Sequence, residues 1–74
     1  METVDLHGVS HYDVSDILDK KFWECMNSNK KSLKIITGNS DRMKQFCVSS
    51  IKEYGFHYQI GDPINKGYIL VYFK

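Results

Sequence analysis

Asp5 and His7 are the two side chains whose types and spacing best suit acid–base chemistry. They stand two residues apart, so in a strand they point to the same face. A carboxylate can orient an imidazole, and histidine is the usual proton-transfer group near neutral pH. The pair therefore predicts a candidate catalytic site. The alternative, the commoner one for an isolated Asp-x-His, is that His7 hydrogen-bonds the next loop and caps the strand.

A second segment, Thr37–Ser40, has the composition of an anion-binding loop. Gly38 permits close approach of the backbone, and Ser40 leads into a helix whose first N–H groups have no intrahelical partner. Arg42 and Lys44 begin that helix and are candidates to pair with phosphates. The alternative is an ordinary strand-to-helix turn with a serine cap.

The remaining histidines and the cysteines predict no metal centre. His11 and His57 lack metal-ligand spacing with a second histidine or cysteine, and Cys25 and Cys47 form no C-x-x-C pair. Both cysteines are expected to be buried, reduced thiols. No cofactor is indicated. A divalent metal is possible but is not indicated either, since a single aspartate is a poor magnesium site.

Length and charge limit what the whole chain can be. Seventy-four residues make one small domain, 1–74, whose chemistry should sit at a surface edge. The net charge of +1 gives no strong overall field toward nucleic acid or membrane, so cations would have to cluster locally. The longest apolar stretch, residues 68–73, is too short to span a bilayer, and the start is no signal peptide. A cytoplasmic location is expected.

Hydrophobic periodicity predicts the order β-α-β-α-β-β, an α+β two-layer sandwich. Strands are expected at residues 3–7, 33–37, 56–60 and 68–73. Ser10 is expected to cap the first helix, and Ser40 and Gly55 to bound the second. The apolar stripes of the helices comprise Val14, Ile17, Leu18, Phe22, Cys25 and Met26, then Met43, Phe46, Cys47, Ser50, Ile51 and Tyr54. The residues expected in the core include all four phenylalanines: Phe22, Phe46, Phe56 and Phe73.

Connection rules turn this order into a predicted geometry. Right-handed crossovers put both helices on one face of a four-stranded mixed sheet, and the last two strands form an antiparallel hairpin. Three connections, residues 8–10, 38–40 and 61–67, then share one edge, where open sheets usually hold ligands. Lys66 joins that edge, whereas Lys30, Lys31 and Lys34 are expected on a solvated face at the opposite edge.

The face that the helices leave open is expected to be apolar. Tyr68, Leu70 and Tyr72 share it with Ile36 and Lys34. Such a face can stack bases or bury itself in a homodimer, and for so short a chain the homodimer is favoured.

Three motifs together resemble the small MutS-related (Smr) domain. Residues 4–8, Val-Asp-Leu-His-Gly, are similar to its Leu-Asp-Leu-His-Gly signature. Thr37-Gly38 before a helix resembles its His/Thr-Gly-x-Gly motif, and Asn65-x-Gly67 with the following apolar strand resembles its closing turn. The resemblance covers the whole chain in order. A stand-alone domain of this length also resembles short bacteriophage Smr proteins, which would place it in a host cytoplasm.

The resemblance implies the fold of the C-terminal domain of translation initiation factor three, and binding or cleavage of DNA or RNA. Asp5 and His7 are then the candidate catalytic residues of an endonuclease. Ser40 replaces the second glycine of the family motif, a departure that favours a module that binds without cleaving. The alternatives are a catalytically silent nucleic-acid-binding module and a small homodimeric interaction domain. The candidate nucleic-acid-binding residues are Gly8, Thr37, Gly38, Asn39, Ser40, Arg42, Lys44 and Lys66.

Overall fold

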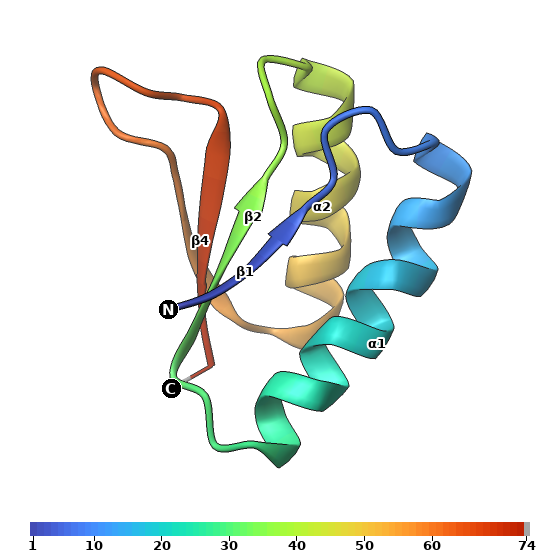
Figure 1. Ribbon diagram of the computed structural model, residues 1–74, viewed down its shortest axis with the longest axis vertical. Helices are drawn as coiled ribbons and strands as arrows, with labels where there is room; N and C mark the ends of the chain where they lie inside the picture. Colours follow the sequence, from blue (N-terminus) through green and yellow to red (C-terminus); the bar gives the residue numbers. More distant parts are fainter. Residues whose placement is uncertain (74) are drawn as a thin grey trace.

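The computed structural model, which describes residues 1–73, has the expected β-α-β-α-β-β order (Figure 1). A short 3-10 helix, η1, precedes the first α-helix. The elements are β1 (Glu2–Asp5), η1 (His11–Asp13), α1 (Val14–Asn27), β2 (Ser32–Ile36), α2 (Asp41–Tyr54), β3 (His57–Ile60) and β4 (Tyr68–Tyr72).

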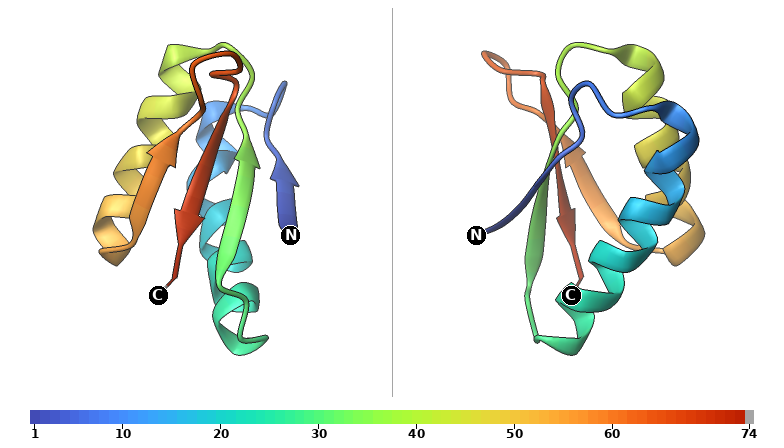
Figure 2. Two further views of the ribbon diagram at one scale, coloured as in Figure 1. Left: turned by 90° about the vertical axis from the view of Figure 1, so that its left-hand side faces the viewer. Right: turned by 45° about the vertical axis from the view of Figure 1, so that its right-hand side comes forward.

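The four strands form one mixed sheet in the order β1-β2-β4-β3. β1 runs parallel to β2, and β4 is antiparallel to both of its neighbours. Figure 2 (left) shows the four strands side by side, with the helices behind them. The hairpin of β3 and β4 was expected from the sequence, but a sheet order running in one direction along the chain was not confirmed. β4 inserts between β2 and β3, which point the same way without pairing.

Both helices cover one face of the sheet, and the core lies between the two layers (Figure 1). Alternate residues of β2 and β4 point into it, as the pattern of buried and half-buried positions shows. This alternation follows from the two-residue period of a strand. The fully buried hydrophobic residues are Leu6, Val14, Leu18, Phe22, Cys25, Leu33, Ile35, Met43, Cys47, Ile51, Ile69 and Val71.

Phe22 is the centre of an aromatic cluster at the end of the core away from the loops that follow β1 and β2. Its ring meets those of Tyr54, Phe56 and Phe73 edge to face, at centroid distances of 5.1, 5.4 and 6.0 Å. Edge-to-face pairs add about 0.5–1.5 kcal/mol each beyond the burial of their area. Three of the four phenylalanines are thus placed in or against the core, as predicted.

Phe46 is the exception, and its assignment to the core was wrong. Its side chain is 44% exposed and stacks on His11, at 5.3 Å between ring centroids. Met26, on the stripe of α1, is also exposed. Both residues lie at the margin of their helical stripe, away from its buried centre.

The helix ends follow their capping residues, with one shift. The Ser40 hydroxyl accepts the Met43 N–H at 3.1 Å, and Gly55 closes α2 with φ +77°. Ser10, expected to cap the first α-helix, instead accepts the Tyr12 N–H and caps η1. Consequently α1 begins three residues later than the serine implied, at Val14.

Candidate functional site

The three predicted connections do meet at one edge of the sheet, the upper edge in Figure 1. The carbonyl oxygen of Gly67 accepts the N–H groups of Thr37 and Gly38, at 2.9 and 3.0 Å. Gly67 in turn donates its N–H to Asn65 Oδ1 at 2.9 Å. This arrangement, here called the Gly67 latch, fixes the β3–β4 hairpin against the loop between β2 and α2.

Asp5 and His7 lie at this edge, on the first connection. β1 ends at Asp5, two residues before the predicted end, and the chain then turns, with Val9 N–H donating to Leu6 O at 3.0 Å. Gly8 has φ +82° in that turn, a conformation that residues with a side chain rarely adopt. Leu6 between them is buried while Asp5 and His7 are both exposed, so the two polar side chains share one side, as their spacing predicted.

The carboxylate of Asp5 holds His7 in place. Asp5 Oδ1 accepts the His7 backbone N–H at 3.0 Å and lies 3.7 Å from His7 Nδ1. The side chains of His7 and Asp5 are 75% and 58% exposed, so the imidazole is open to a ligand from solvent. A Cβ added to Gly38 would lie 3.8 Å from His7 Cβ, which places His7 directly beside the loop between β2 and α2.

Thr37 and Gly38 shape this loop and offer no donor to an anion. Thr37 is buried, and its hydroxyl donates to the Gly38 carbonyl at 2.9 Å. Both of their N–H groups are occupied by the Gly67 latch. A phosphate bound at this loop would therefore need other donors than these two N–H groups.

The free donors lie one step further along, at the start of α2. Within residues 1–73, the backbone N–H groups of residues 39–42 donate no hydrogen bond, because the first turn of a helix has no intrahelical acceptor for them. These N–H groups and the helix dipole favour an anion. The carboxylate of Asp41 in the first turn partly offsets that field.

Arg42 and Lys44, which the sequence placed together, lie on different sides of α2. Residues two positions apart in an α-helix are separated by about 200° around its axis. Arg42 lines a groove with Phe46 next to η1, whereas Lys44 faces β3 and the hairpin. The two cations therefore line different grooves.

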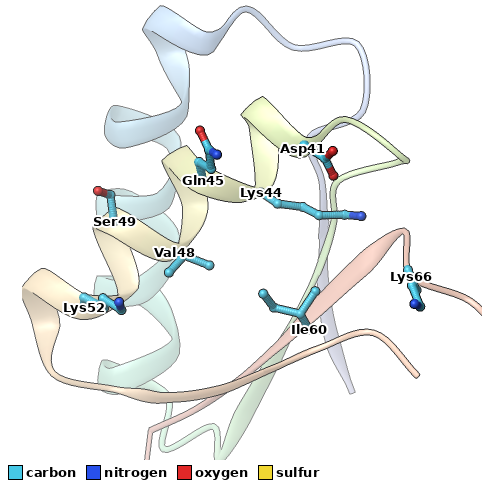
Figure 3. A pocket seen from close by; sticks show the side chains of 8 residues that line it. All are labelled: Asp41, Lys44, Gln45, Val48, Ser49, Lys52, Ile60 and Lys66. Carbon is cyan, nitrogen blue, oxygen red and sulfur yellow. The ribbon is translucent and has the colours of Figure 1, made fainter. Parts of the chain in front are cut away.

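Lys44 and Lys66 do come together, in a groove between α2 and the hairpin (Figure 3). Lys44 extends from α2 toward the hairpin segment that carries Lys66. Lys52, which sequence reasoning missed, adds a third cation eight residues along the same helix row. The groove has a volume of about 550 Å³. We call it the lysine groove; it is lined by Asp41, Lys44, Gln45, Val48, Ser49, Lys52, Ile60 and Lys66.

On the open face of the sheet, Tyr68 finds its partners within the chain. Its hydroxyl donates to Asp62 Oδ2 at 2.9 Å, and the ammonium of Lys34 lies 4.7 Å from the ring centroid. Lys34 is thus half-buried and leans toward the loop edge, which corrects its assignment to a solvated face at the opposite edge. Hydrogen bonds from the N–H of Asn65, the Tyr68 hydroxyl and the N–H of Ile64 hold the pKa of Asp62 below its ordinary value.

Two further features of the described residues are the state of the cysteines and the grouping of possible metal ligands. Cys25 and Cys47 are free and buried, as expected. No three histidine, cysteine, aspartate or glutamate side chains gather as metal ligands within residues 1–73. No helix in the same range is long and apolar enough to cross a membrane.

No known protein family and no curated protein matches the sequence. A solved structure does match: the crystal structure of the Smr domain of Thermus thermophilus MutS2 superposes with a TM-score of 0.87. The match covers 97% of this chain and 96% of that one. The chain folds as an Smr-like domain. The two sequences are 16% identical, so what this Smr-like domain shares with its neighbour is the fold.

Proposed function

We propose that this Smr-like domain binds the phosphate backbone of nucleic acid at its loop edge. The observation that carries the proposal is the placement of His7 beside a loop that leads into four unpaired backbone N–H groups. His7 adjoins Gly38, and the N–H groups follow at residues 39–42. A histidine ring N–H can donate a hydrogen bond to a phosphate oxygen, and the N-termini of helices bind phosphate groups.

The lysine groove supplies the cations that the overall charge does not. The net charge is +1, yet Lys44, Lys52 and Lys66 line one groove that begins at the start of α2. Asp41 is the single carboxylate among the residues that line it. A nucleic-acid strand that crosses the start of α2 would therefore meet the positive charge of the lysine groove on the side of the β3–β4 hairpin. We expect modest, salt-sensitive affinity.

Phosphodiester cleavage is the second candidate function, and the contact between Asp5 and His7 favours it. In hydrolysis a water oxygen bonds to phosphorus, and the bond from phosphorus to the leaving oxygen breaks. His7 either accepts the proton of the attacking water or donates one to the leaving oxygen. Asp5, 3.7 Å from Nδ1, orients the imidazole for either role.

Binding and cleavage are separated by one set of assays. Labelled single-stranded, duplex and branched DNA and structured RNA are incubated with the protein, with and without magnesium. We expect His7→Ala to abolish cleavage while binding falls only a few-fold, and Asp5→Asn to slow cleavage. His57→Ala is the matched control, because His57 is an exposed histidine at the far end of the hairpin.

The outcomes assign the function. Cleavage that survives both His7→Ala and Asp5→Asn would show that these residues are not the catalytic pair. Binding without cleavage on every substrate supports a silent binding module. A protein that binds none of the four nucleic acids contradicts the proposal itself.

A further inference from the structure

A second groove lies on the opposite side of α2 from the lysine groove, against η1 and the start of α1. It has a volume of about 500 Å³, and three aromatic or heteroaromatic rings stand in its wall. We call it the aromatic groove; it is lined by His11, Tyr12, Val14, Ser15, Arg42, Phe46 and Ser50.

The rings of this groove are presented to solvent instead of being packed into the core. Phe46 is 44% exposed and Tyr12 is 95% exposed. His11 stacks on Phe46 with 30° between the ring planes, which leaves the pair as a flat, partly exposed surface. Phe22, the buried ring of the other cluster, instead meets its neighbours Phe56 and Phe73 edge to face. The surface formed by His11 and Phe46 is shaped for a further flat ring.

The polar groups of the aromatic groove suit a heterocycle with hydrogen-bonding edges. The hydroxyl-bearing side chains of Ser15 and Ser50 line it, and both can donate or accept. Arg42 stands in its wall, and no ion pair to Arg42 occurs within residues 1–73. A guanidinium of this kind can stack on a base or pair with its phosphate. An apolar pocket with a few such groups is typical of a site for a flat, polar-edged ligand.

The aromatic groove also adjoins the proposed phosphate site. Arg42 belongs both to its wall and to the first turn of α2, where the N–H groups of Asp41 and Arg42 are unpaired. A nucleotide whose phosphate lies at the start of α2 therefore has its base within reach of the groove.

We propose that the aromatic groove accepts one unstacked nucleobase of a single strand or of a distorted, branched site. This inference rests on the proposed function and deepens it, because it selects unpaired bases over intact duplex. Phe46 and Tyr12 stack on the base, and Arg42 contacts the base or the adjoining phosphate.

The test compares oligonucleotides that have bases with an abasic one. Fluorescence anisotropy measures binding of a labelled single strand and of a strand of equal length that lacks bases throughout. Base–aromatic stacking predicts that Phe46→Ala weakens binding of the ordinary strand by about 5- to 100-fold, with a loss in the same direction for Tyr12→Ala. Binding of the abasic strand should be unchanged in both variants. Trp23→Ala is the matched control, since Trp23 is 64% exposed on α1 and outside the groove.

A 2-aminopurine base in the ordinary strand gives an independent readout. Its fluorescence should change on binding to the wild type and to Trp23→Ala, and should not change with Phe46→Ala. Circular dichroism and the urea midpoint verify that each variant is folded. Because Tyr12 contributes almost nothing to the core, Tyr12→Ala keeps the test valid should Phe46→Ala lose structure.

Each contrary result has a distinct meaning. Equal losses on ordinary and abasic strands, or no loss in either variant, overturn the base-binding inference and leave the proposed function standing. If the groove binds a ligand of another class, such as an apolar peptide segment, neither variant should lose affinity for the ordinary strand. A wild-type protein that binds neither strand overturns the proposed function and this inference together.

Discussion

Replacing all three lysines of the lysine groove by glutamine should flatten the salt dependence of nucleic-acid binding. Each lysine that neutralises a phosphate releases a condensed counterion, which contributes about 0.7 to the slope of log K against log salt for a single strand. Lys44, Lys52 and Lys66 together then account for a slope of about 2. Between about 50 and about 200 mM salt, the wild type should lose about 20-fold more affinity than the triple variant.

The assay is fluorescence anisotropy of a labelled single strand across that salt range. A second triple variant, in which Lys20, Lys30 and Lys31 become glutamine, is the matched control. It makes the same change in net charge, but none of its three lysines lines the lysine groove. The control should keep the wild-type slope.

Two results would refute this reasoning. A wild-type slope in the groove variant would mean that no phosphate lies along the lysine groove. Equal flattening in both triple variants would mean that the chain responds to its total charge, and that the position of its lysines is irrelevant.

Three further predictions concern the stability and reactivity of the fold. A Cβ on Gly61 would lie 2.7 Å from backbone atoms of the hairpin, whereas one on Gly55 meets nothing within 4 Å. Gly55→Ala is expected to lower the free energy of unfolding by about 1–2 kcal/mol, and Gly61→Ala should lower it further. Equal urea midpoints for the two variants would contradict this. Because the pKa of Asp62 lies below its ordinary value of 3.8, its stabilising effect is present above that pH and is lost as the pH falls through the lower, folded value. The urea midpoint of the wild type should thus drop more steeply in acid than that of Asp62→Asn. Burial raises the pKa of Cys47 to about 11 and also raises that of Cys25, so a thiol reagent at about pH 8 should label the native protein far more slowly than the urea-unfolded one.

Local patterns were sufficient to predict the elements and most of their faces. The alternation of Leu6 with Asp5 and His7 assigned buried and exposed positions correctly, and Ser40 and Gly55 marked the ends of α2. These features depend on backbone periods and caps, which act over a few residues. The fold class followed from them, and the likeness to a solved Smr domain supports it.

The details of the site depended on contacts that no local pattern reveals. The Gly67 carbonyl takes the N–H groups of Thr37 and Gly38 from a segment thirty residues away in the chain. Phe46 satisfies the helical period, yet it lies at the margin of the helical stripe, so it was assigned to the core in error. The separation of Arg42 from Lys44 is different, because the turn of a helix alone predicts it.

The Gly67 latch also determines where this fold can accept extra sequence. Additional residues between Pro63 and Ile64 would break the hydrogen bonds that Asp62 accepts from the N–H groups of Ile64 and Asn65. The hydrogen bond from Gly61 N–H to Tyr68 O and the Gly67 latch lie nearer the sheet and would be kept. Each doubling of a flexible loop costs only about 0.6 kcal/mol. The hairpin tip can therefore be lengthened, or can carry an inserted module, while Lys66 stays nearly in register with the start of α2. An additional segment inserted at this point would enlarge the surface that contacts a long ligand and would leave the loop edge of the sheet unchanged.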